Sequence, residues 1–149
     1  MDIPITRTTA PKQKPSMDGI PFGTYFSDHM FLMNYTEGQG WHDARIVPYG
    51  PLSLSPACTA LHYALEVFEG LKAYRTADGK IQMFRPYENA NRLWNSADRI
   101  GVPQVDPEDF VEAVRTLVEL DKDWVPHTEG TSLYIRPVIF GDDSNVGLH

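Results

Sequence analysis

The spacing of apolar residues changes several times along this chain, and each spacing predicts a different element. The segments MFLMNY (30–35) and ARIVPYG (44–50) are typical of strands, and the Gly-rich stretch EGQGWHD (37–43) between them predicts a turn. From Thr59 to Phe68 apolar residues recur every three or four positions, which predicts a helix that Gly70 would cap. The buried face of this helix would consist of Leu61, Ala64, Leu65 and Phe68.

Alternation of apolar and polar residues begins after Gly70. LKAYR (71–75) and KIQMFR (80–85) flank TADG (76–79), whose Asp-Gly pair suits the positive φ of a hairpin turn. Pro86 then opens a helix at its first turn. At helical spacing, its apolar face carries Ala90, Leu93, Ala97 and Ile100, and a polar face carries Asn89, Arg92, Ser96 and Arg99.

The remaining segments complete a mixed pattern. A third helix is predicted to begin at Asp106, a cap residue followed by proline, and to end before Pro126. Residues 1–17 are polar and contain several prolines, so we expect a mobile arm. Hairpins and helices in one chain indicate an α+β domain. The third helix would bury Phe110, Val114 and Leu117.

The segment TSLYIRPVIF (131–140) is predicted to be the last strand. Because side chains alternate along a strand, Tyr134 and Arg136 should share one face. Pro137 cannot donate to a ladder, which indicates an edge strand or a bulge. The opposite face would carry Leu133, Ile135 and Ile139.

Composition narrows the class of protein. The chain has 149 residues, enough for one domain with a real core, and 42% hydrophobic with 22% charged residues is typical of soluble globular proteins. A formal charge of −7 argues against a nucleic-acid or anionic-membrane surface. No apolar run approaches the roughly 20 residues of a membrane span, and the first residues lack the apolar stretch of a secretory signal. The single Cys58 fits a reducing compartment, so we expect a cytoplasmic protein. The histidines and Cys58 do not have the spacing that metal ligands have in HExxH or CxxC motifs, so no metal site is predicted.

Three groups of residues are candidates for binding. Arg92 could hold a phosphate or carboxylate with its planar fork, although a solvated helix face is the simpler reading of its position. Tyr134 and Arg136 could bind a carboxylate together, or they could be an exposed surface pair. Tyr63 and Phe68 could line an apolar pocket, or they could belong to the core. From the residues alone, the prediction is an anion-handling domain and no more.

The order of several motifs is more specific. FGTYFSDHM, GWHDARIVPYGPLSLSPA, LHYALEVFEGLKAYR, FRPYENANRLWNSADRI, VELDKDWVP and SLYIRPVIF resemble, in sequence and spacing, the amino-terminal domain of branched-chain amino-acid aminotransferases. The resemblance extends from about Phe22 to Leu148. It implies the small α+β domain of the fold-type IV pyridoxal-phosphate enzymes over residues 18–149, preceded by the arm at 1–17.

The resemblance also implies a reaction and a set of partners. The parent enzyme would be a homodimer that transfers the amino group of leucine, isoleucine or valine to 2-oxoglutarate, with pyridoxal 5'-phosphate as cofactor. Arg92 matches the arginine that binds the cofactor phosphate. Phe22, Tyr63 and Phe68 match walls of the substrate side-chain pocket, and Tyr63 would reach the neighbouring subunit's site.

Four more positions follow from the same resemblance. Tyr134 would help to hold the substrate carboxylate, and Arg136 would accept the second carboxylate of glutamate. Val146 and Leu148 would help to close the partner subunit's pocket, although the loop sequence DSNVGLH differs from the usual sequence of the family. Lys72 matches a position that is not the cofactor-binding lysine, and is expected at the pocket rim or in solvent.

The family's catalytic lysine lies in a carboxy-terminal domain, and this sequence ends before it. We therefore expect no catalytic residue here, a chain truncated before the catalytic-lysine domain, and no activity from this chain alone. The alternatives are another fold-type IV enzyme, such as a D-amino-acid transaminase or an aminodeoxychorismate lyase, and a non-catalytic binding or dimerisation module.

Overall fold

The structure is a computed structural model that describes residues 1–16 and 22–147. Its antiparallel strands and helices confirm the predicted α+β class. None of the described helices is both long and apolar enough to cross a membrane. The elements, in chain order, are β1 (His29–Thr36), β2 (Gly40–Pro48), α1 (Thr59–Tyr63), β3 (Glu66–Phe68), β4 (Leu71–Arg75), β5 (Ile81–Met83), α2 (Pro86–Ile100), α3 (Pro107–Leu120), the 3-10 turn η1 (Lys122–Trp124), β6 (Leu133–Ile135) and β7 (Val138–Phe140).

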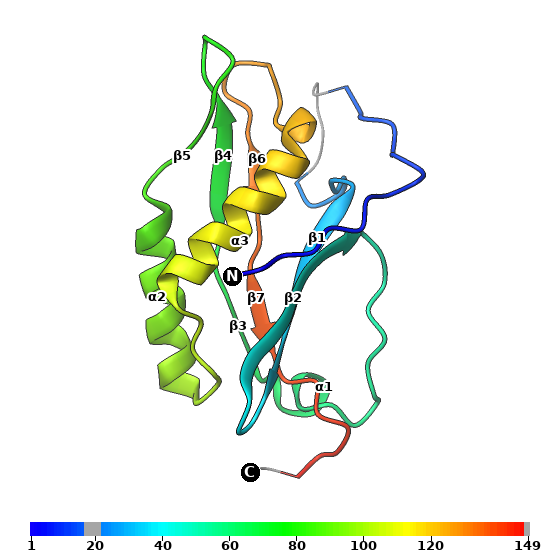
Figure 1. Ribbon diagram of the computed structural model, residues 1–149, viewed down its shortest axis with the longest axis vertical. Coiled ribbons are helices and arrows are strands. Elements are labelled where there is room, and N and C mark those ends of the chain that lie inside the picture. The colour runs from blue at the N-terminus through cyan, green and yellow to red at the C-terminus, as the bar shows by residue number, and fades with distance from the viewer. Residues whose placement is uncertain (17–21, 148–149) are drawn as a thin grey trace.

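A long antiparallel ribbon runs through the centre of the molecule (Figure 1). β3 pairs with β7, and β4 pairs with β6 on one side and β5 on the other. The ribbon is interrupted where Glu69 and Gly70 lie opposite Arg136 and Pro137, and one hydrogen bond from Glu69 N to Pro137 O (3.0 Å) spans the interruption. The predicted last strand is therefore two short strands, because Pro137 has no N–H to continue the ladder.

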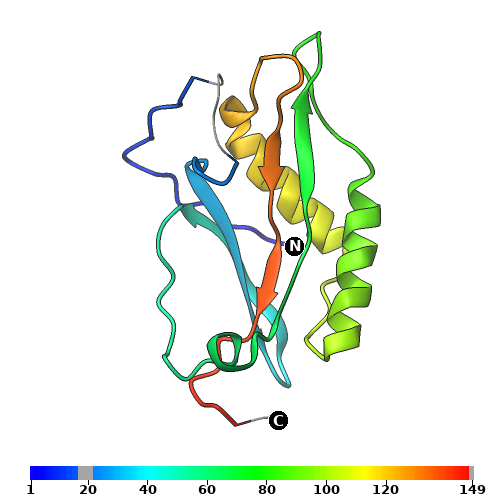
Figure 2. The same cartoon turned by 180° about the vertical axis from the view of Figure 1, so that it is seen from behind.

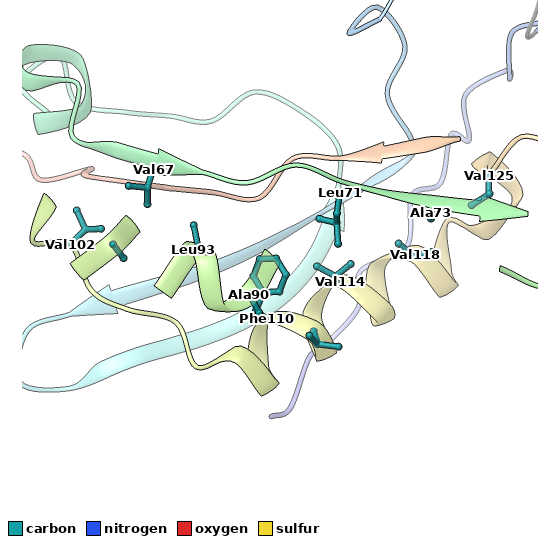
Figure 3. Close-up of a cluster of buried hydrophobic side chains, with 12 residues drawn as sticks. Val67, Leu71, Ala73, Ala90, Leu93, Val102, Phe110, Val114, Val118 and Val125 are labelled. Atoms are coloured by element: carbon teal, nitrogen blue, oxygen red, sulfur yellow. The ribbon is translucent and has the colours of Figure 1, made fainter. Parts of the chain in front are cut away.

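The hydrophobic core lies between this ribbon and the helices α2 and α3. Figure 3 shows Val67 and Leu71 of the ribbon directed toward Leu93 and Val114 of the helices. Neither α2 nor α3 covers the other face of the ribbon, which Figure 2 shows from behind. The buried members of the core are Val67, Leu71, Ala73, Ala90, Leu93, Ala97, Val102, Phe110, Val111, Val114, Val118 and Val125.

Both long helices begin where the sequence predicts. Pro86 is the first residue of α2, and Gly101 ends that helix in the left-handed conformation. The Asp106 side chain caps α3 by accepting a hydrogen bond from Glu108 N (2.8 Å). The buried face of α2 is shorter than predicted, because Ile100 in its last turn is exposed. Ala90, Leu93, Ala97, Phe110 and Val114 are buried as predicted, and Leu117 is half-buried.

The predicted helix from Thr59 to Phe68 is wrong in its second half. α1 ends at Tyr63, Ala64 takes a left-handed conformation (φ 52°, ψ 38°), and residues 66–68 form β3. Leu61 and Phe68, expected to be buried, are 64% and 57% exposed. β3 pairs with β7, and Val67 is buried in the core; these tertiary contacts override the helical spacing. Gly70 is accordingly no helix cap and lies between two strands.

Both predicted hairpins form, and in one of them the turn is shorter than predicted. β4 and β5 pair around a turn in which Gly79 has a φ of +84°. In the first hairpin, β2 already begins at Gly40, so the predicted turn at 37–43 is too long. Trp41 is held in this strand by a hydrogen bond from its indole Nε1 to Gln104 O (2.8 Å).

The described part of the amino-terminal arm lies along β2. Thr6 N donates to Ile46 O, and Ile46 N donates to Pro4 O, each at 2.9 Å. Farther along, Thr8 N donates to His29 Nε2 (3.0 Å), and Lys12 N donates to Asp28 Oδ1 (2.8 Å). These contacts place the arm on the domain. The division between an arm at 1–17 and a domain at 18–149 stays a prediction.

Candidate functional site

The interruption of the ribbon at Glu69 and Gly70 is where binding groups from several elements meet. The Glu69 side chain is only 6% exposed. Its carboxylate accepts hydrogen bonds from Arg92 Nε (2.6 Å) and Nη2 (2.8 Å), which form a bidentate pair. It also accepts from Asn89 Nδ2 (3.1 Å) and from Gly70 N (3.3 Å). Arg92 and Asn89 both project from α2, one helical turn apart.

Charges in this cluster stabilise one another. Hydrogen bonds from Arg92 lower the pKa of the Glu69 carboxyl below its ordinary value; burial acts to raise it, and the Asn89 bond reinforces the lowering. The hydrogen-bonded carboxylate in turn raises the pKa of Arg92. Both groups are therefore ionised at neutral pH. The Arg92 side chain is 66% exposed, so a guanidinium fixed on one edge still presents another edge to solvent.

Gly70 links this ion pair to a second group of side chains. A Cβ built on Gly70 would lie 1.9 Å from the Tyr134 hydroxyl oxygen and 2.7 Å from its ring carbon Cζ. Only a glycine allows the phenol to approach so closely. Asn89 Nδ2 donates to the carbonyl of the same residue (3.1 Å), so Gly70 is contacted from α2 and from β6.

The second group is a cluster of aromatic rings around a guanidinium. Arg136 Nη2 donates to the Tyr134 hydroxyl (3.1 Å), which confirms that these residues share one face of the strand. The Arg136 guanidinium lies over the Phe68 ring, with Cζ 4.5 Å from the ring centroid. Phe22 meets Tyr134 edge to face, with centroids 4.9 Å apart. The structure thus brings together four of the predicted substrate-binding residues.

Two other predicted residues, Tyr63 and Val146, form a separate contact. Tyr63 donates its hydroxyl to Val146 O (2.9 Å), which joins the end of α1 to the carboxy-terminal segment. Within the described part of the chain, no hydrogen bond or ring contact connects this pair to Phe68 or Tyr134. Leu148 lies outside the described residues. Lys72 is exposed and pairs with Tyr134 across β4 and β6.

Sequence reasoning missed Glu69, although a signal was present. In an extended strand Glu69 is in phase with Val67 and Leu71, both of which are buried. A carboxylate at a core-facing position must be paired and hydrogen-bonded, which points to a nearby cation. The predicted helix through Phe68 conceals this alternation of Val67, Glu69 and Leu71. Two surface depressions, lined by residues such as Ile5 with Leu120 and Pro4 with Val47, contain none of the site residues.

The site therefore contains binding groups of three kinds. Arg92 offers an oriented guanidinium edge suited to a phosphate group. Tyr134 and Arg136 offer a phenol and a second guanidinium suited to carboxylates. Phe22 and Phe68 offer exposed apolar rings beside them. A ligand with a phosphate, a carboxylate and an apolar side chain would match this set.

The chain is similar to curated proteins over nearly its whole length. The chain is 50% identical to branched-chain-amino-acid transaminase 1 of Bacillus subtilis (strain 168) over 142 residues, which are 95% of this chain and 40% of that protein. It therefore spans well under half the length of the curated relatives it matches. No family model matches the sequence.

Solved structures are similar over a smaller part of this chain. The branched-chain aminotransferase of Thermoproteus uzoniensis, solved with norvaline, gives a TM-score of 0.59 and 28% identity over 70% of this chain and 33% of that chain. The T.th. branched-chain amino acid aminotransferase, solved with N-(5'-phosphopyridoxyl)-L-glutamate, gives a TM-score of 0.52 and 35% identity over 64% of this chain and 30% of that chain.

Proposed function

We propose that this chain, which belongs to the branched-chain amino-acid aminotransferase family, is the cofactor-phosphate and substrate-pocket part of an enzyme that transaminates leucine, isoleucine and valine with 2-oxoglutarate. The observation that carries the proposal is the convergence of the Glu69–Arg92 pair and the Tyr134–Arg136 pair on Gly70. The relatives are named for branched-chain amino acids, which favours this substrate class over D-amino-acid transaminase or aminodeoxychorismate lyase activity.

The chemistry of the donor set fits pyridoxal 5'-phosphate. Arg92 would hold the phosphate, because a permanently charged planar fork suits a dianionic ester. A solved relative carries a phosphopyridoxyl derivative of glutamate, which supports this choice of cofactor. When bound, the cofactor withdraws electrons from the substrate, which allows the amino group to be exchanged. We assign the cofactor-binding lysine to the part of the protein outside this chain, so residues 1–149 alone should be inactive.

The substrate groups would be distributed over the aromatic cluster. The Tyr134 hydroxyl would bind the carboxylate that all substrates share, and Arg136 would bind the second carboxylate of glutamate. Phe22, Phe68 and Tyr63 would surround the aliphatic side chain, where burial stabilises binding by about 0.8 kcal/mol per methylene. In a homodimer, Val146 and Leu148 would close the partner subunit's pocket. The single Cys58, buried and free, suits a cytoplasmic enzyme.

Activity of the full-length protein tests this proposal. With L-leucine and 2-oxoglutarate, we expect glutamate to form at a rate that depends on added pyridoxal phosphate. D-Alanine in place of L-leucine should give no comparable rate, which separates the proposal from a D-amino-acid transaminase. Preference for D-alanine, or absence of exchange with all three branched-chain amino acids, would contradict it.

A further inference from the structure

The proposed function assigns no role to Glu69, yet its carboxylate is the centre of the hydrogen-bond network in the site. The side chain is nearly buried and receives four hydrogen bonds, from Arg92 Nε and Nη2, Asn89 Nδ2 and Gly70 N. Its backbone is fixed as well, because Glu69 N donates to Pro137 O (3.0 Å) across the ribbon. The Glu69 carboxylate is therefore an anion held in place by hydrogen bonds, and it pairs with the exposed guanidinium of Arg92.

We propose that Glu69 is a positioning residue for the cofactor phosphate: it holds Arg92 by Nε and Nη2 and leaves the Nη1 edge of the guanidinium for the phosphate ester. The inference rests on the proposed function, because it takes Arg92 as the phosphate-binding residue. A guanidinium carries its N–H donors in a flat fork, and Glu69 engages one on Nε and one on Nη2. Among the described residues, Nη1 forms no hydrogen bond.

The phosphate should bind beside Glu69 and not in its place. If the phosphate displaced Glu69 from Arg92, a carboxylate that is 6% exposed would lose its cation, which is strongly unfavourable. The alternative that keeps every charge paired is a guanidinium shared by two anions, one on each edge. Glu69 then determines which edge faces the cofactor.

A fixed guanidinium binds better than a free one. Arg92 is 66% exposed, and an arginine without a partner loses considerable rotamer freedom when it engages a ligand. Glu69 imposes that restriction before the cofactor arrives, so less conformational freedom is lost on binding. The negative charge of Glu69 opposes a dianion, and the two effects have opposite signs. Positioning predicts that removing Glu69 weakens phosphate binding, whereas repulsion predicts that it strengthens binding.

Comparing two cofactor forms isolates the role of Glu69. In the full-length apoenzyme, the dissociation constants of pyridoxal phosphate and of pyridoxal, which lacks the phosphate, are measured by absorbance titration. Glu69→Gln preserves the size of the side chain but replaces one acceptor oxygen with a donor, so the bidentate pair cannot form. We expect pyridoxal phosphate to bind about tenfold more weakly or worse, with pyridoxal binding unchanged.

A matched control is provided by Glu88→Gln on the same helix. Glu88 is exposed and pairs with Arg85 (3.1 Å), so this change removes the same charge and none of the hydrogen bonds of Arg92. It should leave both constants unchanged. A purely structural role of Glu69 would weaken both cofactor forms equally, and a repulsive role would tighten pyridoxal phosphate; either result overturns the inference. Equal shifts in both variants would attribute the effect to long-range charge and overturn it too.

A second variant covers the case in which Glu69→Gln fails to fold. Asn89→Ala removes the hydrogen bonds of Asn89 to the Glu69 carboxylate and to Gly70 O, and it keeps the ion pair. It should weaken the binding of pyridoxal phosphate, but less than Glu69→Gln does, and it should leave the binding of pyridoxal unchanged. An unchanged ratio of the two constants would then refute the inference. If the wild-type protein binds no pyridoxal phosphate, the proposed function fails first, and this result is distinguishable from a wild type that binds and a Glu69 variant that binds equally well.

Discussion

Gly70→Ala is expected to damage the proposed substrate site more than the fold. The added Cβ would lie 1.9 Å from the Tyr134 hydroxyl, whereas ordinary contact begins at 3.4 Å, so the phenol must withdraw by about 1.5 Å, the difference of the two. Forcing extra volume into a packed position costs about 1–3 kcal/mol. Tyr134 is only half-buried and can swing toward solvent, so we expect the lower part of this range. That movement would break the bond to Arg136 and the contact with Phe22.

Urea denaturation of the full-length protein measures the stability cost, and kcat/KM for leucine measures the functional cost. Gly50→Ala is the control, because nothing lies within 4 Å of a Cβ at Gly50 and its φ is not positive. A double-mutant cycle with Tyr134→Ala identifies the cause: without the phenol, Gly70→Ala should cost almost nothing. If Gly70→Ala costs the same in both backgrounds, the close approach of Tyr134 is not the reason for the glycine.

The remaining predictions concern the two arginines, the acid limit and the end of α1. Arg92→Ala should weaken the binding of pyridoxal phosphate by a few kcal/mol, which is measured from the absorbance that remains during dialysis. Arg92→Lys should recover part of this affinity, and Arg99→Ala should lose none of it. Arg136→Ala should lower kcat/KM for glutamate more than for leucine, by roughly 1.5–3 kcal/mol, because only glutamate has a second carboxylate; equal losses would argue against that role. The lowered pKa of Glu69 gives stability that is fully present above its ordinary value of 4.5 and is lost as pH falls through the folded-state value, so Glu69→Gln should flatten the acid limb of a stability curve. Ala64→Gly should raise stability by about 1 kcal/mol in urea, because Ala64 adopts a left-handed conformation; a lower midpoint would contradict this.

Local signals in the sequence predict the elements that depend on local contacts. α2 and α3 have prolines in the first turn and a regular apolar face, so their existence and starts could be read directly. The segment after α1 could not, because its apolar spacing fits a helix equally well. What decides it is the pairing of Val67 with Ile139, a contact between distant parts of the chain that no local window contains.

In the site, too, the features that depend on local contacts could be predicted, and those that depend on contacts between distant parts of the chain could not. Tyr134 and Arg136 could be placed together because a single strand with a period of two contains both. The position of Arg92 on a polar helix face could be read, but the residue that pairs with it could not, because Glu69 lies between β3 and β4, 23 residues away in the sequence. The contact between Phe22 and Tyr134 likewise depends on how a loop and β6 meet in the fold. The role proposed for each residue rests on resemblance to a family, not on spacing.

The Glu69–Arg92 pair contributes geometry more than stability. A largely buried carboxylate loses hydration, and replacing a buried ion pair by apolar residues is often neutral or stabilising. An apolar residue in phase with Val67 and Leu71 would continue the core without that cost. The pair instead ties a side chain of α2 to the residue before Gly70, against which Tyr134 of β6 packs. The proposed phosphate-binding group, Arg92, and the proposed carboxylate-binding group, Tyr134, therefore both contact the segment of Glu69 and Gly70, so a shift of this segment would move both together and preserve their spacing.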